Sequence, residues 1–210
     1  VTNRPSLNEI SSQINYRRTV NENTNYNIGI KWISRINKSN YRLDTFNYNI
    51  NNYEIVNDNS YTNSFYAKQD ILATFGNISF PLSKKITGEA GLRLEQTFDN
   101  LDFNSGTKIK RNYFQIIHNA TIYYAINDNS YLSLDLNKNI YRPAIFYLNP
   151  IANVSNPKNI ELGNQALLPE KNYLFSLSFN KSKKSNNFSF SAYFQKSTDL
   201  IALSLFSKSG

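Results

Sequence analysis

The chain has 210 residues, which suffices for one domain or for part of a larger one, and it carries a net charge of +8. It contains no cysteine, which excludes disulfides and thiolate metal sites, and no apolar run of about 18 residues, which excludes a membrane-spanning helix. Because the Lys and Arg residues are dispersed and lie mostly near turns, we expect solvated turns or contacts with anionic lipid headgroups, and no nucleic-acid partner.

Apolar and polar residues alternate along the first part of the chain, which is the period of a β-strand with two different faces. We predict strands over residues 12–20 and 24–35, joined by a polar turn. Residues 37–63 are rich in Asn and Tyr, and we predict a long excursion with a small hairpin of its own, with low-complexity disorder as the alternative. A long strand over 64–80 follows. Its apolar parity changes near Gly76, which predicts a bulge there.

The second part of the chain continues the alternation. We predict strands over 86–98, 111–125, 131–141, 173–179 and 188–194, separated by a loop over 99–110, a tight turn at 127–129, a long loop over 142–169 and a turn over 182–186. Residues 197–210 begin another loop or strand. This makes eight strands whose connections alternate between short and long, as in transmembrane barrels with tight periplasmic turns and long extracellular loops. Negative mean hydropathy combined with 15 Tyr and 14 Phe fits such a barrel.

The predicted long loop carries a series of short motifs. They are Tyr141-Arg142-Pro143, Leu148-Asn149-Pro150, Gly163-Asn164 and Leu168-Pro169-Glu170. This series resembles the signature of TonB-dependent receptors of the Gram-negative outer membrane, of the outer membrane protein beta-barrel type. Gln165 stands where that pattern usually has a proline. Weaker similarities at 91–97 and 198–201 extend the resemblance over about residues 65–201.

The resemblance implies an all-β fold, namely an antiparallel transmembrane β-barrel segment that belongs to a larger barrel. Residues 1–210 would then be a single partial β-barrel domain in the cell outer membrane, with the plug domain and the remaining strands outside this chain. The implied function is TonB-dependent uptake of a bulky nutrient such as an iron chelate, a peptide or a glycan. The implied partners are outer-membrane lipid, TonB and the plug domain.

Two other functions stay open on the sequence alone. Eight strands can close into a small barrel filled with side chains, which would act as a structural or adhesive outer-membrane protein. The alternation also fits a soluble secreted β-sandwich that binds carbohydrate. Lipid burial separates the last alternative from the others, because a sandwich folds without detergent.

Two groups of residues are candidates for the site. The first is the motif, which we expect to anchor the loop, with ligand contact as the alternative role: Tyr141, Arg142, Pro143, Asn149, Pro150, Gly163, Asn164, Pro169 and Glu170. Within it, Gly163 and Asn164 would supply a backbone able to take positive φ. The second group consists of charges on polar strand faces, expected to face a lumen and to pair across strands or to line a permeation path: Glu89, Arg93, Glu95 and Asp135.

Further expectations concern aromatic residues and chemistry. Aromatic side chains near strand ends would form interfacial girdles: Trp32, Phe80, Phe98, Tyr124, Tyr131, Tyr141 and Tyr173. His118 is the only histidine and has no motif around it, so we predict no catalytic residue, no metal, no cofactor and no enzymatic activity. Ligand binding would use residues 37–63, 99–110 and 142–169, because loops carry function on a rigid scaffold.

Overall fold

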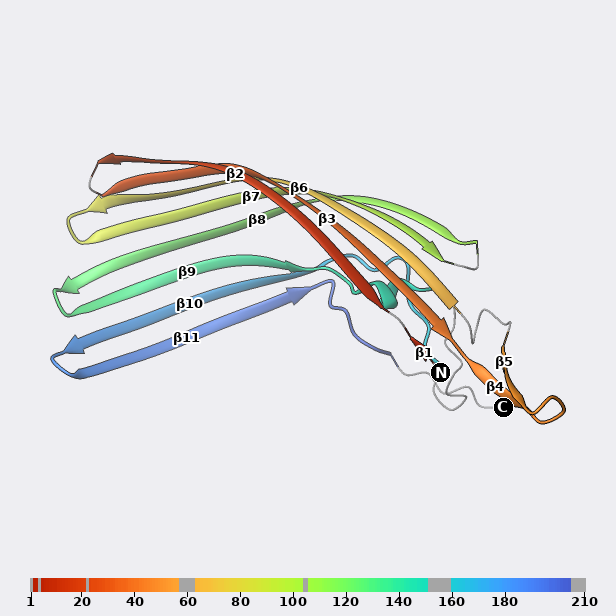
Figure 1. Cartoon of the computed structure of the whole chain (residues 1–210). Coiled ribbons are helices and arrows are strands. Elements are labelled where there is room, and N and C mark those ends of the chain that lie inside the picture. The colour runs from red at the N-terminus through yellow and green to blue at the C-terminus, as the bar shows by residue number, and fades with distance from the viewer. Residues whose placement is uncertain are drawn as a thin grey trace.

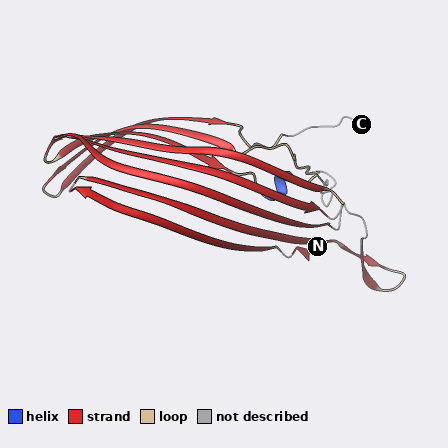
Figure 2. Cartoon of the chain, turned by 90° about the horizontal axis from the view of Figure 1, so that it is seen from above, coloured by secondary structure: helices blue, strands red, loops and turns tan. Residues whose placement is uncertain are grey.

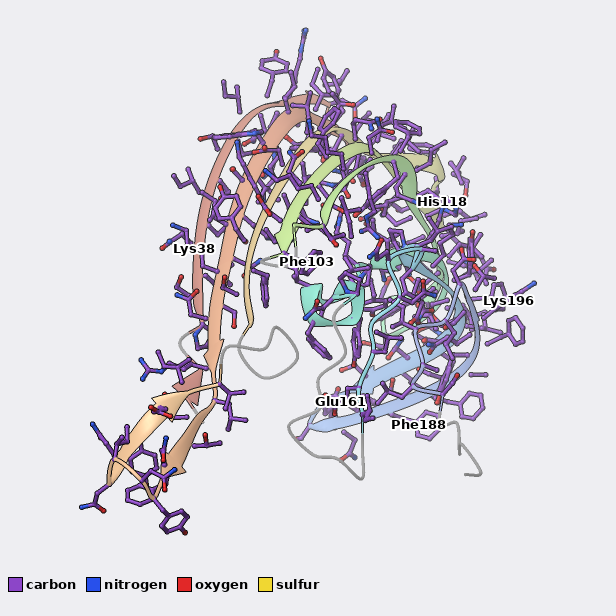
Figure 3. All side chains as sticks on the ribbon, turned by 90° about the vertical axis from the view of Figure 1, so that its right-hand side faces the viewer. Lys38, Phe103, His118, Glu161, Phe188 and Lys196 are labelled. Carbon is purple, nitrogen blue, oxygen red and sulfur yellow. The ribbon has the colours of Figure 1, made fainter. Side chains whose placement is uncertain are left out.

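A single antiparallel sheet dominates the fold of the computed structural model, which describes residues 2–3, 5–21, 23–56, 63–103, 106–150 and 160–204. The sheet arches along its length and curls across its width (Figures 1 and 3). Its long strands lie side by side in chain order: β2 Ser6–Asn21, β3 Thr24–Arg42, β6 Asn63–Ser83, β7 Ile86–Phe103, β8 Lys108–Asn127, β9 Ser130–Tyr141, β10 Glu170–Lys183 and β11 Asn186–Thr198. The eight predicted strands are therefore confirmed.

A short strand, β1 (Thr2–Asn3), pairs with β3 beyond the start of β2. Pro5 lies between the two, and proline has no N–H with which to continue the ladder. At the other side of the sheet, β11 pairs with β10 alone among the described residues. The described sheet is thus an open wall, and β2 and β11 do not pair with each other.

Tight turns connect the strands at one end of the sheet (Figure 2). Three of them share a side-chain cap, in which a side-chain oxygen accepts a hydrogen bond from the backbone N–H two residues later. The acceptors are Asn21, Ser83 and Asn127, at distances of 3.1, 3.3 and 3.0 Å. Such local hydrogen bonds favour turns over continued strand.

The opposite end is less regular, and two predictions about it need correction or completion. The predicted loop over 99–110 is wrong, because β7 extends to Phe103 and β8 starts at Lys108, in register from Ile86↔Tyr124 to Asp102↔Lys108. The predicted excursion over 37–63 contains its hairpin, formed by β4 (Asp44–Asn47) and β5 (Asn52–Ile55). β3 occupies the start of that segment, and residues 57–62 lie outside the described residues.

The predicted bulge at Gly76 is also wrong. Gly76 pairs with Ile28 and Leu92 in an unbroken register, and the shift lies between Pro81 and Ser83. The apolar parity changes for another reason: Ile71, only 1 % exposed, lies on the concave face of β6, whereas Ile78 lies on the convex face. Both faces of this strand therefore carry apolar side chains, which are buried at Ile71 on the concave face and exposed at Ile78 on the convex face.

The two faces of the sheet differ in composition. Cross-strand partners share a face, so the registers assign each residue to one side. The convex side carries exposed apolar residues on every long strand, including Ile14, Ile30, Leu72, Leu92, Ile122, Leu136, Phe175 and Phe190. In the described part of the chain no second sheet stacks against them, which contradicts the β-sandwich alternative.

The only apolar core lies on the concave side, near the loop end of the sheet, as far as the described residues show. Ala67, Leu101 and Phe103 from β6 and β7 pack there with Leu148 of the short 3-10 helix η1 (Ile145–Leu148). η1 sits inside the curl of the sheet (Figure 3). No helix in the described residues has the length and apolar character needed to cross a membrane.

Candidate functional site

The motif loop is held together by its own backbone. The N–H of Gly163 donates to the carbonyl of Asn149 at 2.9 Å, and the N–H of Asn164 donates to that of Tyr147 at 2.6 Å. The side chain of Asn164 then accepts from the N–H of Ala166 at 2.9 Å. Two motif segments far apart in the sequence, around η1 and around Gly163, therefore pair directly. The intervening residues 151–159 lie outside the described residues.

Gly163 is needed for close backbone approach rather than for positive φ. A Cβ at this position would lie 2.6 Å from the carbonyl oxygens of Asn149 and Tyr147, closer than real Cβ contacts come. Neither Gly163 nor Asn164 has a positive φ, whereas Asn51, Gly106, Lys184 and Asp199 do. The expectation of a left-handed backbone at Gly163-Asn164 is therefore wrong, and the lack of a side chain is what the contact requires.

Arg142 connects the start of this loop to the concave face of β7. Its Nη2 donates to Glu95 Oε2 and, at 3.3 Å, to Thr97 Oγ1. Arg93 Nε donates to the other carboxylate oxygen of Glu95 at 2.5 Å. The side chain of Glu95 is 6 % exposed, so two guanidinium groups neutralise one buried carboxylate.

A second set of polar contacts crosses the sheet nearer the loop end. Glu9 on β2 accepts from Arg35 on β3 at 2.5 Å, and Arg35 donates onward to Gln69 on β6 at 3.3 Å. Gln69 donates to Asp99 on β7 at 2.9 Å, and Arg111 on β8 donates to the same carboxylate at 2.8 Å. We call this chain the concave ladder. It joins five neighbouring strands through side chains in addition to the backbone.

The concave ladder ends on the motif loop. Arg111 Nη1 donates to the carbonyl of Leu167 at 2.8 Å and to that of Gln165 at 3.4 Å. Loop carbonyls on the inner side of a wall need such donors because no neighbouring strand is available to them. Arg142 therefore holds the start of the described loop against β7, and Arg111 holds its end against β8.

A hollow of about 550 Å³ lies between the concave ladder and η1. Its polar lining comes from the sheet and the start of the motif loop, including Glu9, Arg35 and Arg142, and its apolar lining comes from the core, including Ala67 and Leu148. The described residues contain no group of three or more His, Asp or Glu side chains arranged to hold a metal ion. The hollow offers charged hydrogen-bond donors and acceptors beside an apolar wall.

The remaining candidate residues are placed as follows. Asp135 lies on the concave face between β8 and β10, where its carboxylate accepts from Thr121 at 2.8 Å and from Ser176 at 3.3 Å. Glu89 lies on the same face nearer the tight turns and is exposed.

The other motif residues lie where the loop leaves and rejoins the sheet. Tyr141 and Glu170 pair with each other across β9 and β10. Pro143 and Pro169 are buried, and Pro150 is half-buried.

Sequence reasoning missed the members of the concave ladder. Asp99 fell in the segment interpreted as a loop, although its side chain is only 3 % exposed, and Arg111 was predicted as the first residue of a strand without a role in the site. Two of the predicted girdle residues also lie on the wrong face. Tyr131 contacts the ring of Tyr123 on the concave side, with 6.4 Å between centroids, and Tyr141 has the same parity as Tyr131. The other five lie on the convex face.

Comparison with known proteins decides the family. The outer membrane protein beta-barrel family matches residues 2–209. The chain belongs to this family. A search of curated proteins found no match. As an outer-membrane beta-barrel chain it lies in the cell outer membrane, and its convex apolar face is the one that contacts lipid.

Solved structures share the fold of this family chain. The ferric yersiniabactin uptake receptor FyuA from Yersinia pestis aligns with a TM-score of 0.66 at 11 % identity, over 94 % of this chain and 30 % of that one. The copper transporter OprC aligns with a TM-score of 0.69 at 12 % identity, over 91 % and 30 %. The ferric citrate transporter FecA aligns with a TM-score of 0.61 at 11 % identity, over 92 % and 27 %. The chain thus spans about 30 % of the length of the receptors it resembles.

Proposed function

We propose that this chain forms part of the barrel wall of a TonB-dependent outer-membrane receptor that imports a bulky nutrient. The main support is the concave face, because a chain segment and a buried charge network occupy it. A small closed eight-stranded barrel would instead fill its interior with side chains alone. The family and the barrel fold shared with uptake receptors agree with this proposal.

The partners follow from the same proposal. Residues 1–210 make up one partial barrel domain, and further strands complete the ring so that no backbone edge meets lipid. A plug domain occupies the lumen, against the concave ladder and the hollow below η1. TonB supplies the energy for moving the plug, and outer-membrane lipid surrounds the convex face.

The motif residues anchor the loop in this proposal. Arg142 and Gly163 hold it in place, and Arg93, Glu95 and Asp135 form the charged lining of the wall. The nutrient meets segments at the loop end, namely the β4–β5 hairpin within the predicted binding segment 37–63 and the described parts of the motif loop, 142–150 and 160–169. The chain contributes binding and passage, with no catalytic step. The nutrient class remains an iron chelate, a peptide or a glycan.

Uptake by the intact receptor tests the proposal. The receptor would be produced in a Gram-negative host with and without TonB, and cells would be offered ⁵⁵Fe-labelled ferric chelates, labelled peptides and labelled oligosaccharides. We expect one class to accumulate inside cells only when TonB is present and to stay surface-bound otherwise. Accumulation that is equal without TonB would contradict the proposal and indicate a passive pore.

Loop anchoring has its own control. Arg142→Ala in the intact receptor should lower nutrient binding, because it leaves Glu95 without its loop partner. Lys184→Ala, at the tight-turn end, should leave binding unchanged. Equal binding by both variants would remove the role proposed for Arg142 and leave the transport proposal standing.

A further inference from the structure

The exposed apolar residues of the convex face form a band that starts at the tight turns. The backbone pairing marks where this band ends toward the loop end of the sheet. The β8–β9 ladder runs from Asn127↔Ser130 to Asn119↔Asn137 and ends there, although both strands continue. Unpaired backbone groups are not tolerated in hydrocarbon, so the separation of the two strands must lie at or beyond the lipid boundary. We use this level as the outer edge of the membrane.

The length of the band agrees with this assignment. The last β8–β9 pair and its register partners on β10 and β11 lie seven to nine positions from the turn-side ends of these four strands. At about 3.3 Å per residue and a tilt of about 40°, this is roughly 18–23 Å, close to the usual height of about 25 Å for the apolar band of such barrels. The tight turns face the periplasm, and the boundary above the band is the extracellular one.

Cationic and hydrogen-bonding side chains gather at this boundary on the convex face of four neighbouring strands. Lys138 on β9, Tyr173 on β10 and Lys196 on β11 stand in one register row. His118 lies on β8 one position beyond the last β8–β9 pair. His118 and Lys196 both point away from the inside of the curl (Figure 3). We call Lys138, Tyr173, Lys196 and His118 the rim cluster.

The spacing of the rim cluster is narrow. Neighbouring strands lie about 4.8 Å apart, so Lys138 and Lys196 flank Tyr173 at a backbone separation of about 10 Å. The ammonium of Lys138 lies 5.7 Å from the centroid of the Tyr173 ring, so the aromatic ring holds it close. Lys171, two positions further from the membrane, is neutralised by Asp199 at 2.8 Å. The charge that stays available at the boundary comes from Lys138 and Lys196.

The other half of the wall differs at the same height. Eight to ten positions from the turns, the convex face of β2, β3, β6 and β7 carries uncharged residues: Ser12, Trp32, Ser34, Thr74, Leu94 and Gln96. Lysines that only extended to the interface from a uniform surface would be spread around the wall. At this height the lysines of the described convex face are Lys138 on β9 and Lys196 on β11, whereas Lys38 on β3 and Lys68 on β6 stand at least four positions further from the tight turns.

We propose that the rim cluster binds the phosphorylated headgroup of an outer-leaflet lipid. Two ammonium groups about 10 Å apart match a headgroup with more than one phosphate, and the Tyr173 hydroxyl and the His118 ring supply further hydrogen bonds. Below the cluster, Leu136, Phe175 and Phe194 offer an apolar surface to the acyl chains. This lipid site is independent of the transport proposal, since it lies on the opposite face from the hollow.

Lipid retention by the intact receptor tests the site. The receptor would be placed in phosphatidylcholine nanodiscs with 10 mol % diphosphoryl lipid A, and retained lipid would be counted by native mass spectrometry. The double variant Lys138→Gln/Lys196→Gln should retain roughly ten- to thirtyfold less lipid, from about 1 kcal/mol for each lysine. The matched control Lys183→Gln/Lys184→Gln, at the tight-turn end, should retain as much as the unchanged protein, and Lys138→Arg/Lys196→Arg should retain most of it.

Three outcomes would overturn the proposal. Equal retention by the rim variant and the unchanged protein would show that the cluster does not hold lipid. An equal loss in the tight-turn control would show that any surface lysine serves. Displacement of lipid A by an equal phosphate concentration of inorganic phosphate, or equal retention of its dephosphorylated form, would show that the cluster does not recognise a lipid phosphate.

Discussion

The convex and concave faces of the sheet reverse the usual arrangement of a soluble protein. On the convex face the large apolar side chains are exposed, with Phe190 at 62 % and Ile14 at 82 %. On the concave face polar groups are buried, with Thr97 at 0 % and Asp99 at 3 %. The difference shows that the two sides of one backbone meet different solvents, lipid outside and a polar interior inside.

The two faces are also stabilised by different interactions. The convex face relies on transfer of apolar surface into hydrocarbon and needs no partner from the protein. The concave face relies on specific pairs, in which each charge compensates another across strands or across the loop. Substitutions should therefore be tolerated differently on the two sides, and the predictions below go from the largest expected effect to the smallest.

Removing Glu95 should have the largest effect. Glu95→Ala leaves the partly buried guanidinium groups of Arg93 and Arg142 without their shared carboxylate, which should cost about 3–5 kcal/mol of unfolding free energy. Denaturant unfolding of the intact protein in lipid vesicles measures it. Glu54→Ala, in the exposed β4–β5 hairpin, is the control and should change stability by less than about 0.5 kcal/mol. Similar values for both variants would refute the buried network.

Arginine on the lipid face should have the next largest effect. Leu134→Arg places a charge in the apolar band of β9 and should cost about 2–4 kcal/mol in the same vesicle assay. Asn137→Arg, on the concave side of the same strand, should be nearly neutral because its side chain meets the polar interior. If the two substitutions lowered the unfolding free energy equally, the assignment of the convex face to lipid and of the concave face to a polar interior would be wrong.

Adding a methyl group at Gly163 should act on the loop alone. Gly163→Ala forces apart the backbone contacts with Asn149 and Tyr147 and should cost about 1–3 kcal/mol. Faster amide exchange at Gly163 and Asn164 would report the loosened loop. Gly76→Ala is the matched control, because its new Cβ meets only Ile28 Cγ2 at 3.6 Å. Unchanged amide exchange in Gly163→Ala would contradict the explanation that close backbone approach requires glycine at this position.

An exposed pair at the loop end should matter least. Lys108 and Asp102 lie 3.3 Å apart with side chains 71 % and 47 % exposed, so Asp102→Asn should change stability by less than about 0.5 kcal/mol. The neighbouring Asp99→Asn should cost several times more, since Asp99 is buried against Arg111. Comparable losses of unfolding free energy would mean that side-chain exposure does not determine how much each ion pair stabilises the protein.

Much of the wall could be predicted from the sequence because lipid imposes a strict period of two. Lipid-facing positions within the membrane favour apolar residues, so apolar residues recur at every second position. This alternation locates the strands and turns, and it assigns Glu95 and Asp135 to the polar face. Beyond the lipid boundary this constraint disappears. The strands β7 and β8 continue there with polar residues on the convex face and a mixture of polar and apolar residues on the concave face, which made 99–110 resemble a loop.

The site could be predicted only in part. The motif itself indicated Arg142 and Gly163, but no spacing indicates that Arg142 meets Glu95, 47 residues earlier. Such pairs depend on the register of strands and on the path of the loop. The apparent bulge at Gly76 arose in the same way, because Ile71 is buried inside the curl by contacts that parity does not encode.

Lipid accessibility along β9 tests the central claim most directly. This chain has no cysteine, so single cysteines at positions 132–137 can carry a spin label in the intact protein in vesicles. Collision rates with oxygen should peak at positions 132, 134 and 136, and collision rates with a water-soluble nickel complex should peak at positions 133, 135 and 137. Rates without this alternation, or with the reverse alternation, would contradict a wall that separates lipid from a polar interior.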